Sequence, residues 1–260
     1  MMLRYYLALL VLFSNSTWGQ DSMSLITEGE YRPLYLSADS PLMKVSAFLL
    51  DKKPVTNRDF YQFVSTNIQW QRDMVPLLFA ENSYLSHWQK IDDQYAPKSE
   101  DLKKPVVFVS WYAAQAYCAS QQKRLVTVAE WEYVAQASTQ LKNGSQDKQF
   151  YQKILDWYAK AAYSTPPNVG EDEPNYWGVH NLHGAIWEWT DDFNSELISG
   201  ESRGDSSINQ ELYCATGSAG AVDPSNYAAF MRYAFRSSLN AKFTIGSLGF
   251  RCAQDGKNKE

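Results

Sequence analysis

Residues 181–193 read NLHGAIWEWTDDF, a segment that sets hard oxygen ligands and a glycine among tryptophans. A tight turn at this glycine can aim the side chains of Asn181 and Glu188 and the carbonyls of Gly184 and Ile186 at one point. Mixed all-oxygen ligation of this kind suits Ca²⁺. The alternative from the residues alone is that Glu188 pairs with a buried arginine.

Three helix-capping patterns occur earlier in the chain, well before this segment. Thr127 and Glu130 form a T-x-x-E capping box in front of an apolar helix. Ser110 is predicted to cap a helix that runs to about Gln122. Thr56 is predicted to cap another helix, whose apolar residues follow it in the sequence.

Further elements are weaker. We expect strands at 45–50 and 106–109 and a helix over about 147–161. From STPPNVGEDEPNYWG (164–178) onward, prolines and glycines exclude long helices, and short β segments, turns and loops are expected. The chain is therefore predicted to be a single α+β domain with a loop-dominated C-terminal half.

The N-terminus MMLRYYLALLVLFSNSTWGQ carries one arginine, a short apolar run and then small polar residues. This pattern is typical of a secretory signal peptide over residues 1–19, with the domain at 20–260 and its core at about 31–253. An uncleaved anchor is the alternative, although the apolar run is short for a membrane span. The expected location is the periplasm, with no stable membrane insertion after cleavage.

Composition excludes one class of partner. The 260 residues carry a formal charge of -5, and Lys and Arg never form a run longer than two, so nucleic acid is not expected as a partner. No GxSxG, P-loop, HExxH or GxGxxG motif is present. The three cysteines, in an exported protein, suggest one disulfide and one leftover thiol, and spacing alone does not decide the pair.

Two histidines and three arginines each have two alternative roles, one structural and one in ligand binding. His180 and His183 are three apart, but the flanking glycines favour hydrogen-bonded turn residues over a transition-metal site. Arg232, Arg236 and Arg251 lie among aromatic residues, where they serve either structural ion pairs or an anionic ligand.

Four segments together resemble the sulfatase-modifying-factor family, which comprises formylglycine-generating enzymes and their relatives. They are PVTNRDFYQFV, KPVVFVSWYAAQAYCASQQKRLVTVAEWEYVA, YWGVHNLHGAIWEWTDDF and RYAFRSSLNAKFTIGSLGFRCA. The resemblance implies one compact α+β domain with little regular secondary structure, distantly related to C-type lectins. It also implies a disulfide between Cys118 and Cys252, which leaves Cys214 free.

The same resemblance implies structural Ca²⁺ at Asn181, Gly184, Ile186 and Glu188. The family's second calcium segment has no clear counterpart between residues 161 and 176.

One departure from the family concerns catalysis. Formylglycine-generating enzymes have a GGSW-like strand followed by two cysteines that bind copper and activate oxygen. The matching stretch here is ATGSAGAVDPSNYAAFMRYAFRSS, in which Ser218 matches the family's serine and no cysteine lies between Ser218 and Arg236. Copper is therefore not indicated, nor is iron, because the extra helical domain of iron-dependent relatives is absent. Enzymatic activity is left open, with Cys214, Ser218 and Arg236 as candidate catalytic residues.

One subgroup of the family fits best. GEYRPLY, QWQRDMVPLLFAENSYLSHW and DPSNYAAFMRYAFRSSL resemble exported proteins found beside copper nitrite reductase in denitrifying bacteria. This implies an accessory or maturation factor that holds a client protein or peptide, with copper nitrite reductase as the expected partner. The alternative is a metal-dependent oxidoreductase that acts on a protein or peptide side chain through Cys214 or another ligand set.

Overall fold

The computed structural model describes residues 22–32, 42–144, 147–159, 165–194 and 224–256. The predicted signal peptide and two of the candidate catalytic residues, Cys214 and Ser218, lie outside these ranges. Within them, no helix has the length and apolar character needed to cross a membrane.

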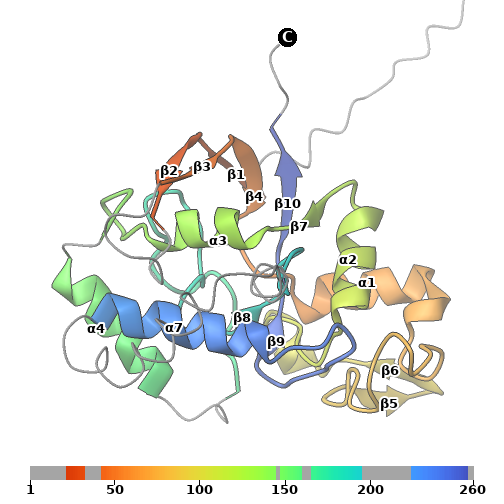
Figure 1. The fold of residues 1–260 in the computed structure, drawn as a ribbon. Coiled ribbons are helices and arrows are strands. Elements are labelled where there is room, and N and C mark those ends of the chain that lie inside the picture. Colours follow the sequence, from red (N-terminus) through yellow and green to blue (C-terminus); the bar gives the residue numbers. More distant parts are fainter. Residues whose placement is uncertain (1–21, 33–41, 145–146, 160–164, 195–223, 257–260) are drawn as a thin grey trace, which may run out of the picture.

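A four-stranded antiparallel sheet gathers segments from the beginning, middle and end of the described chain. Its order is β1 (Met23–Ile26), β4 (Phe48–Asp51), β10 (Cys252–Asp255) and β7 (Arg124–Leu125). Phe48 and Leu50 alternate into the core from β4, and Leu50 pairs with Ala253 of β10. The sheet therefore depends on pairings between residues far apart in sequence (Figure 1).

The other strands form pairs. The antiparallel pairs are β2 (Gly29–Tyr31) with β3 (Met43–Val45), and β5 (Gln89–Ile91) with β6 (Gln94–Ala96). The parallel pair is β8 (Trp187–Glu188) with β9 (Leu248–Gly249). This last pair attaches the segment at 181–193 to the chain that leads into β10.

The expected caps are present. Thr56 and Asp59 form a capping box on α1 (Asn57–Thr66), and Thr127 and Glu130 form one on α3 (Val128–Ala135). The Ser110 hydroxyl accepts from Ala113 N at the start of α2 (Trp111–Ser120). Each cap satisfies a backbone donor that the first helical turn leaves without a partner. The remaining helices are α4 (Lys148–Ala159), α7 (Pro224–Ser237) and the 3₁₀ helices η1 (Ile68–Trp70) and η2 (Ser99–Asp101).

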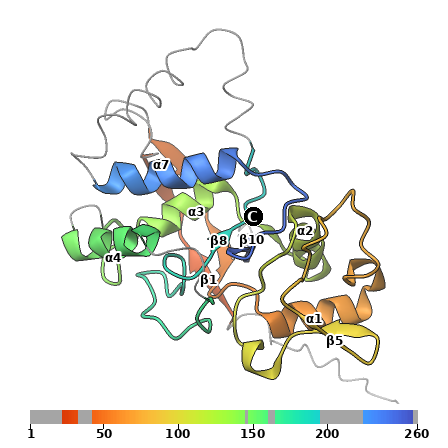
Figure 2. The same ribbon diagram turned by 90° about the horizontal axis from the view of Figure 1, so that it is seen from below.

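The helix α7 corrects the expectation that the C-terminal part holds no long helix. It is 14 residues long and begins with Pro224, whose missing N–H costs nothing in a first turn. The prolines at 166–174 interrupt only their own loop. Helices α3, α4 and α7 lie on one side of β10, and α1 and α2 on the other (Figure 2).

Two strand predictions were also wrong in part. The single strand expected at 45–50 is divided between β3 and β4. Residues 106–109 form no named strand, although Val106 and Val109 are fully buried. The reason lies at Phe108, which has a φ of +54° and whose N–H donates to the carbonyl of Ile245, distant in sequence, rather than to a strand.

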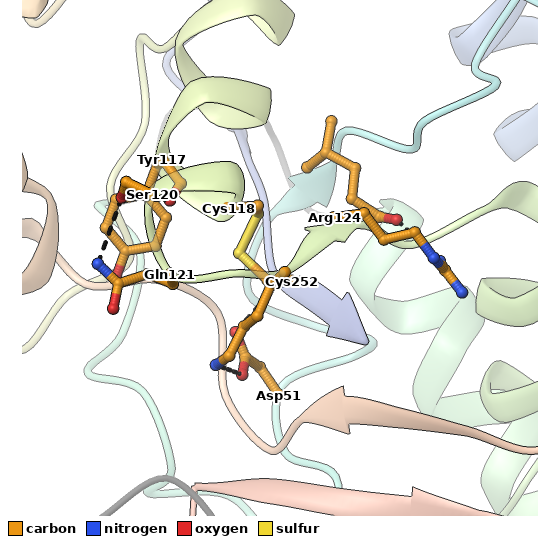
Figure 3. The surroundings of a disulfide bond; sticks show 9 residues. Asp51, Tyr117, Cys118, Ser120, Gln121, Arg124 and Cys252 are labelled. Atoms are coloured by element: carbon orange, nitrogen blue, oxygen red, sulfur yellow. Dashed lines mark hydrogen bonds and ion pairs between the residues drawn. A yellow bond between two sulfur atoms is a disulfide. The ribbon is translucent and has the colours of Figure 1, made fainter. Parts of the chain in front are cut away.

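A disulfide joins α2 to the sheet. Cys118 and Cys252, 134 positions apart, are bonded in the fully buried core, with Cα atoms 5.6 Å apart (Figure 3). This is the pair that the family resemblance implies. Beside it, Cys252 N donates to Asp51 Oδ2 at 3.1 Å, which ties the bridge to β4.

We expect the Cys118→Ala/Cys252→Ala variant to lose about 3–5 kcal/mol of unfolding free energy, because the bridge closes a loop of more than one hundred residues. Urea denaturation of the two proteins measures this difference. Cys214→Ser is the matched control, since it removes a thiol but not this bridge. Equal midpoints for the wild type and the double variant would contradict the prediction.

Candidate functional site

The centre of the candidate site is a buried ion pair between Glu188 and Arg251, whose side chains are both 0% exposed. Arg251 Nη2 lies 2.7 Å from Glu188 Oε1, and Arg251 Nε lies 2.9 Å from Oε2. Trp131 Nε1 donates to Oε2 at 2.9 Å. Arg251 also donates to the carbonyls of Asp51 and His180. The alternative expectation, that Glu188 pairs with a buried arginine, is confirmed.

Asn181 makes a different set of contacts. It has a φ of +56°, its Oδ1 accepts from Gly170 N at 2.6 Å, and its N–H donates to Asp172 Oδ2 at 2.7 Å. Gly184, with a φ of +98°, makes the tight turn that the sequence suggests. The hydrogen-bond partners of Asn181 and Glu188 thus have no residue in common, and both side chains already accept from protein donors.

Metal binding at this turn is not decided by these contacts. Among the residues that the structure describes, no three His, Cys, Asp or Glu side chains are grouped as metal ligands. The predicted calcium set contains one carboxylate, Glu188, and draws its other oxygens from Asn181 and from the Gly184 and Ile186 carbonyls. Calcium binding there would require the Glu188 carboxylate to ligate the ion in addition to accepting hydrogen bonds from Arg251 and Trp131. It stays a prediction.

The two loop histidines are hydrogen-bonded. His180 Nδ1 lies 2.9 Å from the Asp172 carbonyl, and His183 Nε2 lies 2.9 Å from the Ala135 carbonyl. Burial lowers the pKa of His183 to about 4, so its ring is neutral at pH 7. The expectation that both are hydrogen-bonded turn residues is confirmed.

A second buried ion cluster joins α3 to α7. Arg232 donates from Nε and Nη2 to the two carboxylate oxygens of Glu132, each at 2.8 Å, and Arg236 Nη1 donates to Glu132 Oε1 at 2.7 Å. Burial raises the pKa of Glu132, but Arg232 and Arg236 outweigh it and lower the pKa to about 2. Both guanidinium groups also lie over the Trp131 ring.

These contacts show whether the three arginines serve structural ion pairs or bind an anionic ligand. Arg232, Arg236 and Arg251 all make structural ion pairs. Arg236, proposed from sequence as a candidate catalytic residue, uses its guanidinium to connect two helices. Glu132 was missed as its partner, although the spacing of four between Arg232 and Arg236 places both on one face of α7.

An aromatic wall and one cavity border this cluster, and a second cavity adjoins the first. Trp187 stacks on Phe235 at 4.2 Å, and Trp157 and Tyr158 each lie 5.4 Å from Trp187. A cavity of about 400 Å³ reaches Glu132 and Arg232, and one of about 520 Å³ reaches Asp172 and Asn181. Phe150, Ile154 and His183 line both cavities, so the two adjoin along α4.

The chain matches the family model described as "Sulfatase-modifying factor enzyme 1-like domain" over residues 13–256. It belongs to the sulfatase-modifying-factor family. It is 30% identical to the formylglycine-generating enzyme of Mus musculus, over 92% of this chain and 72% of that protein. It is 29% identical to the formylglycine-generating enzyme of Streptomyces coelicolor, over 65% and 59% respectively.

Another relative has a different description. The "Inactive C-alpha-formylglycine-generating enzyme 2" of Mus musculus is 29% identical, over 83% of this chain and 78% of that protein. Among solved structures, PvdO from Pseudomonas aeruginosa is similar, with 14% identity and a TM-score of 0.47, over 90% of this chain and 94% of that one.

We expect Glu188→Ala to lower the unfolding free energy by about 3–5 kcal/mol, because it leaves the Arg251 guanidinium buried without a counter-charge. Urea denaturation measures the loss, with Glu173→Ala, which removes an exposed carboxylate, as the control. A loss below about 1 kcal/mol would contradict the expectation that the Glu188–Arg251 ion pair stabilises the fold.

Calcium requires a separate test, because the ion pair alone predicts this destabilisation. If Ca²⁺ binds at the turn, a chelator lowers the melting temperature of the wild-type protein and added Ca²⁺ restores it. Melting that is unchanged by both treatments would contradict the calcium prediction.

We expect the ionised Glu132 carboxylate to stabilise the folded protein at neutral pH and to lose this effect in acid. Its folded pKa of about 2 lies below its ordinary value of 4.5, so its contribution is complete above pH 4.5 and is lost as the pH falls toward 2. Glu132→Gln should lower stability at pH 7 and flatten the loss between pH 4.5 and 2. Urea midpoints across this range measure it, and a wild-type slope in the variant would contradict the assignment. Glu171→Gln is the exposed control.

Proposed function

We propose that the protein is an exported accessory factor of the sulfatase-modifying-factor family. In this proposal it holds a client protein or peptide and does not generate formylglycine through a copper site with two thiolates. The alternative function is metal-dependent oxidation of a client side chain.

The observation that carries the proposal is the assignment of the cysteines. The sequence holds three, and the structure bonds Cys118 to Cys252. Cys214 is the one that remains. Soft copper(I) sites favour thiolate ligands, and the two cysteines that follow the GGSW-like strand in formylglycine-generating enzymes have no counterparts between Ser218 and Arg236. A pair of free thiols would require breaking a disulfide that links α2 to β10.

The relatives support a function without that chemistry. They include formylglycine-generating enzymes and also a protein whose name describes it as inactive. The family fold therefore does not by itself imply activity, and a site must be argued from its own residues.

Export and the partner are further parts of the proposal. Disulfides persist in oxidising compartments, so the buried Cys118–Cys252 bond agrees with a periplasmic location after removal of residues 1–19. Copper nitrite reductase is the proposed client, on the strength of the three segments that resemble proteins found beside that enzyme.

The first test is an activity assay on a cysteine-containing sulfatase-motif peptide with copper and oxygen. We expect no aldehyde product by mass spectrometry, whereas an active formylglycine-generating enzyme run in parallel converts the peptide. Conversion of the peptide by this chain would contradict the proposal.

The second test concerns the client. Copper nitrite reductase is expressed in a periplasm with and without this protein, and its copper content and yield are measured after purification. We expect a higher fraction of copper-loaded enzyme when the accessory protein is present. Equal loading in both samples, with the accessory protein confirmed in the periplasm, would remove nitrite reductase as the client.

Cys214 favours one alternative function. It is the single cysteine outside the disulfide, so it is available as a lone thiolate ligand or nucleophile in a metal-dependent oxidoreductase. Cys214→Ser distinguishes the two functions. Unchanged client loading and unchanged metal content support the accessory factor, while loss of a stoichiometric metal ion and of client oxidation supports the oxidoreductase.

A further inference from the structure

The larger of the two cavities along α4 is rich in carboxylates and has no role in the proposed function. Its volume is about 520 Å³, and its walls include α4 and the loop at 167–184. Among the described residues, Lys153 is its only lysine or arginine. The four carboxylates that line it are those of Asp147, Glu171, Asp172 and Glu173. We call it the acidic cavity, and its volume is in the range of pockets that bind small ligands.

The charge of these carboxylates is not neutralised inside the cavity. Within the part of the chain that the structure describes, none of the four forms a salt bridge with a lysine or an arginine. Asp147 accepts from Phe150 N at 3.1 Å, and Asp172 Oδ1 lies 3.3 Å from His180 Nδ1. The other two carboxylates belong to exposed residues of the loop. A cationic ligand can therefore enter a negative field that the protein itself leaves unbalanced.

The carboxylates are spread over the cavity and do not meet at one point. Among the described residues, no three His, Cys, Asp or Glu side chains are grouped as metal ligands. A metal ion such as Ca²⁺ needs its oxygen ligands together, at about 2.3–2.6 Å from the ion. Carboxylates distributed around a cavity of this volume instead suit an organic cation, which is larger and is attracted by all of them.

Apolar side chains make up much of the remaining lining. They include Phe150, Ile154 and Trp157 of α4, together with Val179 and Leu182 of the loop. An aliphatic stem packs well against such residues, as the stems of lysine side chains do on protein surfaces. The face of an aromatic ring also attracts a cation. The lining therefore favours a cationic head group on an apolar stem.

One buried acceptor in the lining has no partner in the described chain. His183 Nε2 lies 2.9 Å from the Ala135 carbonyl, so Nε2 carries the ring proton and Nδ1 keeps its lone pair. The Nδ1 atom is buried and makes no hydrogen bond, and a buried polar atom without a partner is costly. Because His183 lines both cavities, the N–H of a bound ligand can supply the missing donor. An ammonium group has three donors and no acceptor.

We propose that the acidic cavity binds a primary ammonium group carried on an aliphatic stem. The head group is attracted by the four carboxylates and donates to Nδ1 of His183, and the stem packs against Phe150 and Trp157. A free aliphatic amine and a lysine side chain of a client protein share this chemistry. The site is separate from the proposed function, because it requires neither the cysteines nor copper nitrite reductase.

A nuclear magnetic resonance titration with pentylamine tests the site, and pentanol, which has the same stem without the charge, is the neutral control. We expect pentylamine to shift the signals of the Trp157 indole N–H and of His183 Nδ1 until they saturate. Pentanol should leave both signals unchanged at the same concentrations. The His183 signal reports the hydrogen bond at Nδ1 directly, because that atom has no donor in the free protein.

Two pairs of variants test the role of the carboxylates. Glu171→Gln/Glu173→Gln changes two exposed residues of the cavity and should raise the pentylamine dissociation constant by about three- to tenfold. Glu28→Gln/Glu100→Gln removes the same charge from exposed positions outside the cavity and should leave the constant unchanged. Urea denaturation verifies that both variants are as stably folded as the wild type.

A peptide distinguishes the two sources of the ammonium group. The probe is a short glycine–alanine peptide with blocked ends and one central lysine, and its control carries norleucine in place of the lysine. Saturable binding of the lysine peptide, without binding of the norleucine peptide, shows that a client lysine can enter the cavity. Binding of pentylamine without binding of the lysine peptide assigns the cavity to a free amine.

Three results would overturn the proposal. The first is the absence of a saturable shift when pentylamine is added to the wild-type protein. The second is binding of pentanol as tight as that of pentylamine, or an equal effect of the two pairs of variants, because either would show that the cavity carboxylates do not select the charge. The third is displacement of pentylamine by an equal concentration of Ca²⁺, which would assign the cavity to a metal ion. None of these results depends on the client or on the cysteine chemistry, so the two proposals fail separately.

Discussion

The ion pair between Glu188 and Arg251 lies where three parts of the chain meet. Glu188 belongs to β8, Arg251 lies between β9 and β10, and the guanidinium also holds carbonyls of Asp51 and His180. Two charges with no exposed surface are tolerable only when each is paired and fully hydrogen-bonded. The local backbone around both residues must therefore be correct before either charge can be buried.

The rest of the fold repeats this dependence on distant partners. The central sheet draws on residues 23 to 255, and the disulfide joins residues 134 positions apart. The Glu132 cluster connects α3 to α7 across about one hundred positions. With short strands and helices of 8 to 14 residues, local structure contributes little stability by itself, and long-range packing contributes most of it.

Local signals in the sequence predicted the starts of α1, α2 and α3, since Thr56, Ser110 and Thr127 act through residues three positions away. They failed for α7, because the prolines at 166–174 restrict only their own loop and have no effect on a helix that begins at Pro224. They could not choose between calcium and arginine at Glu188, since the partner lies 63 positions along the chain. The buried stretch at 106–109 looked like a strand because its apolar run records burial, whereas sheet pairing depends on neighbours that the segment does not encode.

The position of β10 has a consequence for how the molecule comes into being. This strand lies inside the sheet, between β4 and β7, although it is the last of the four in chain order. A ribosome must therefore synthesise the chain through residue 255 before the central sheet can close. Until then β4 and β7 lack their shared neighbour and Cys118 lacks Cys252. The central sheet and its disulfide are therefore completed by the last strand to be synthesised, so the domain is expected to close in one late step rather than segment by segment.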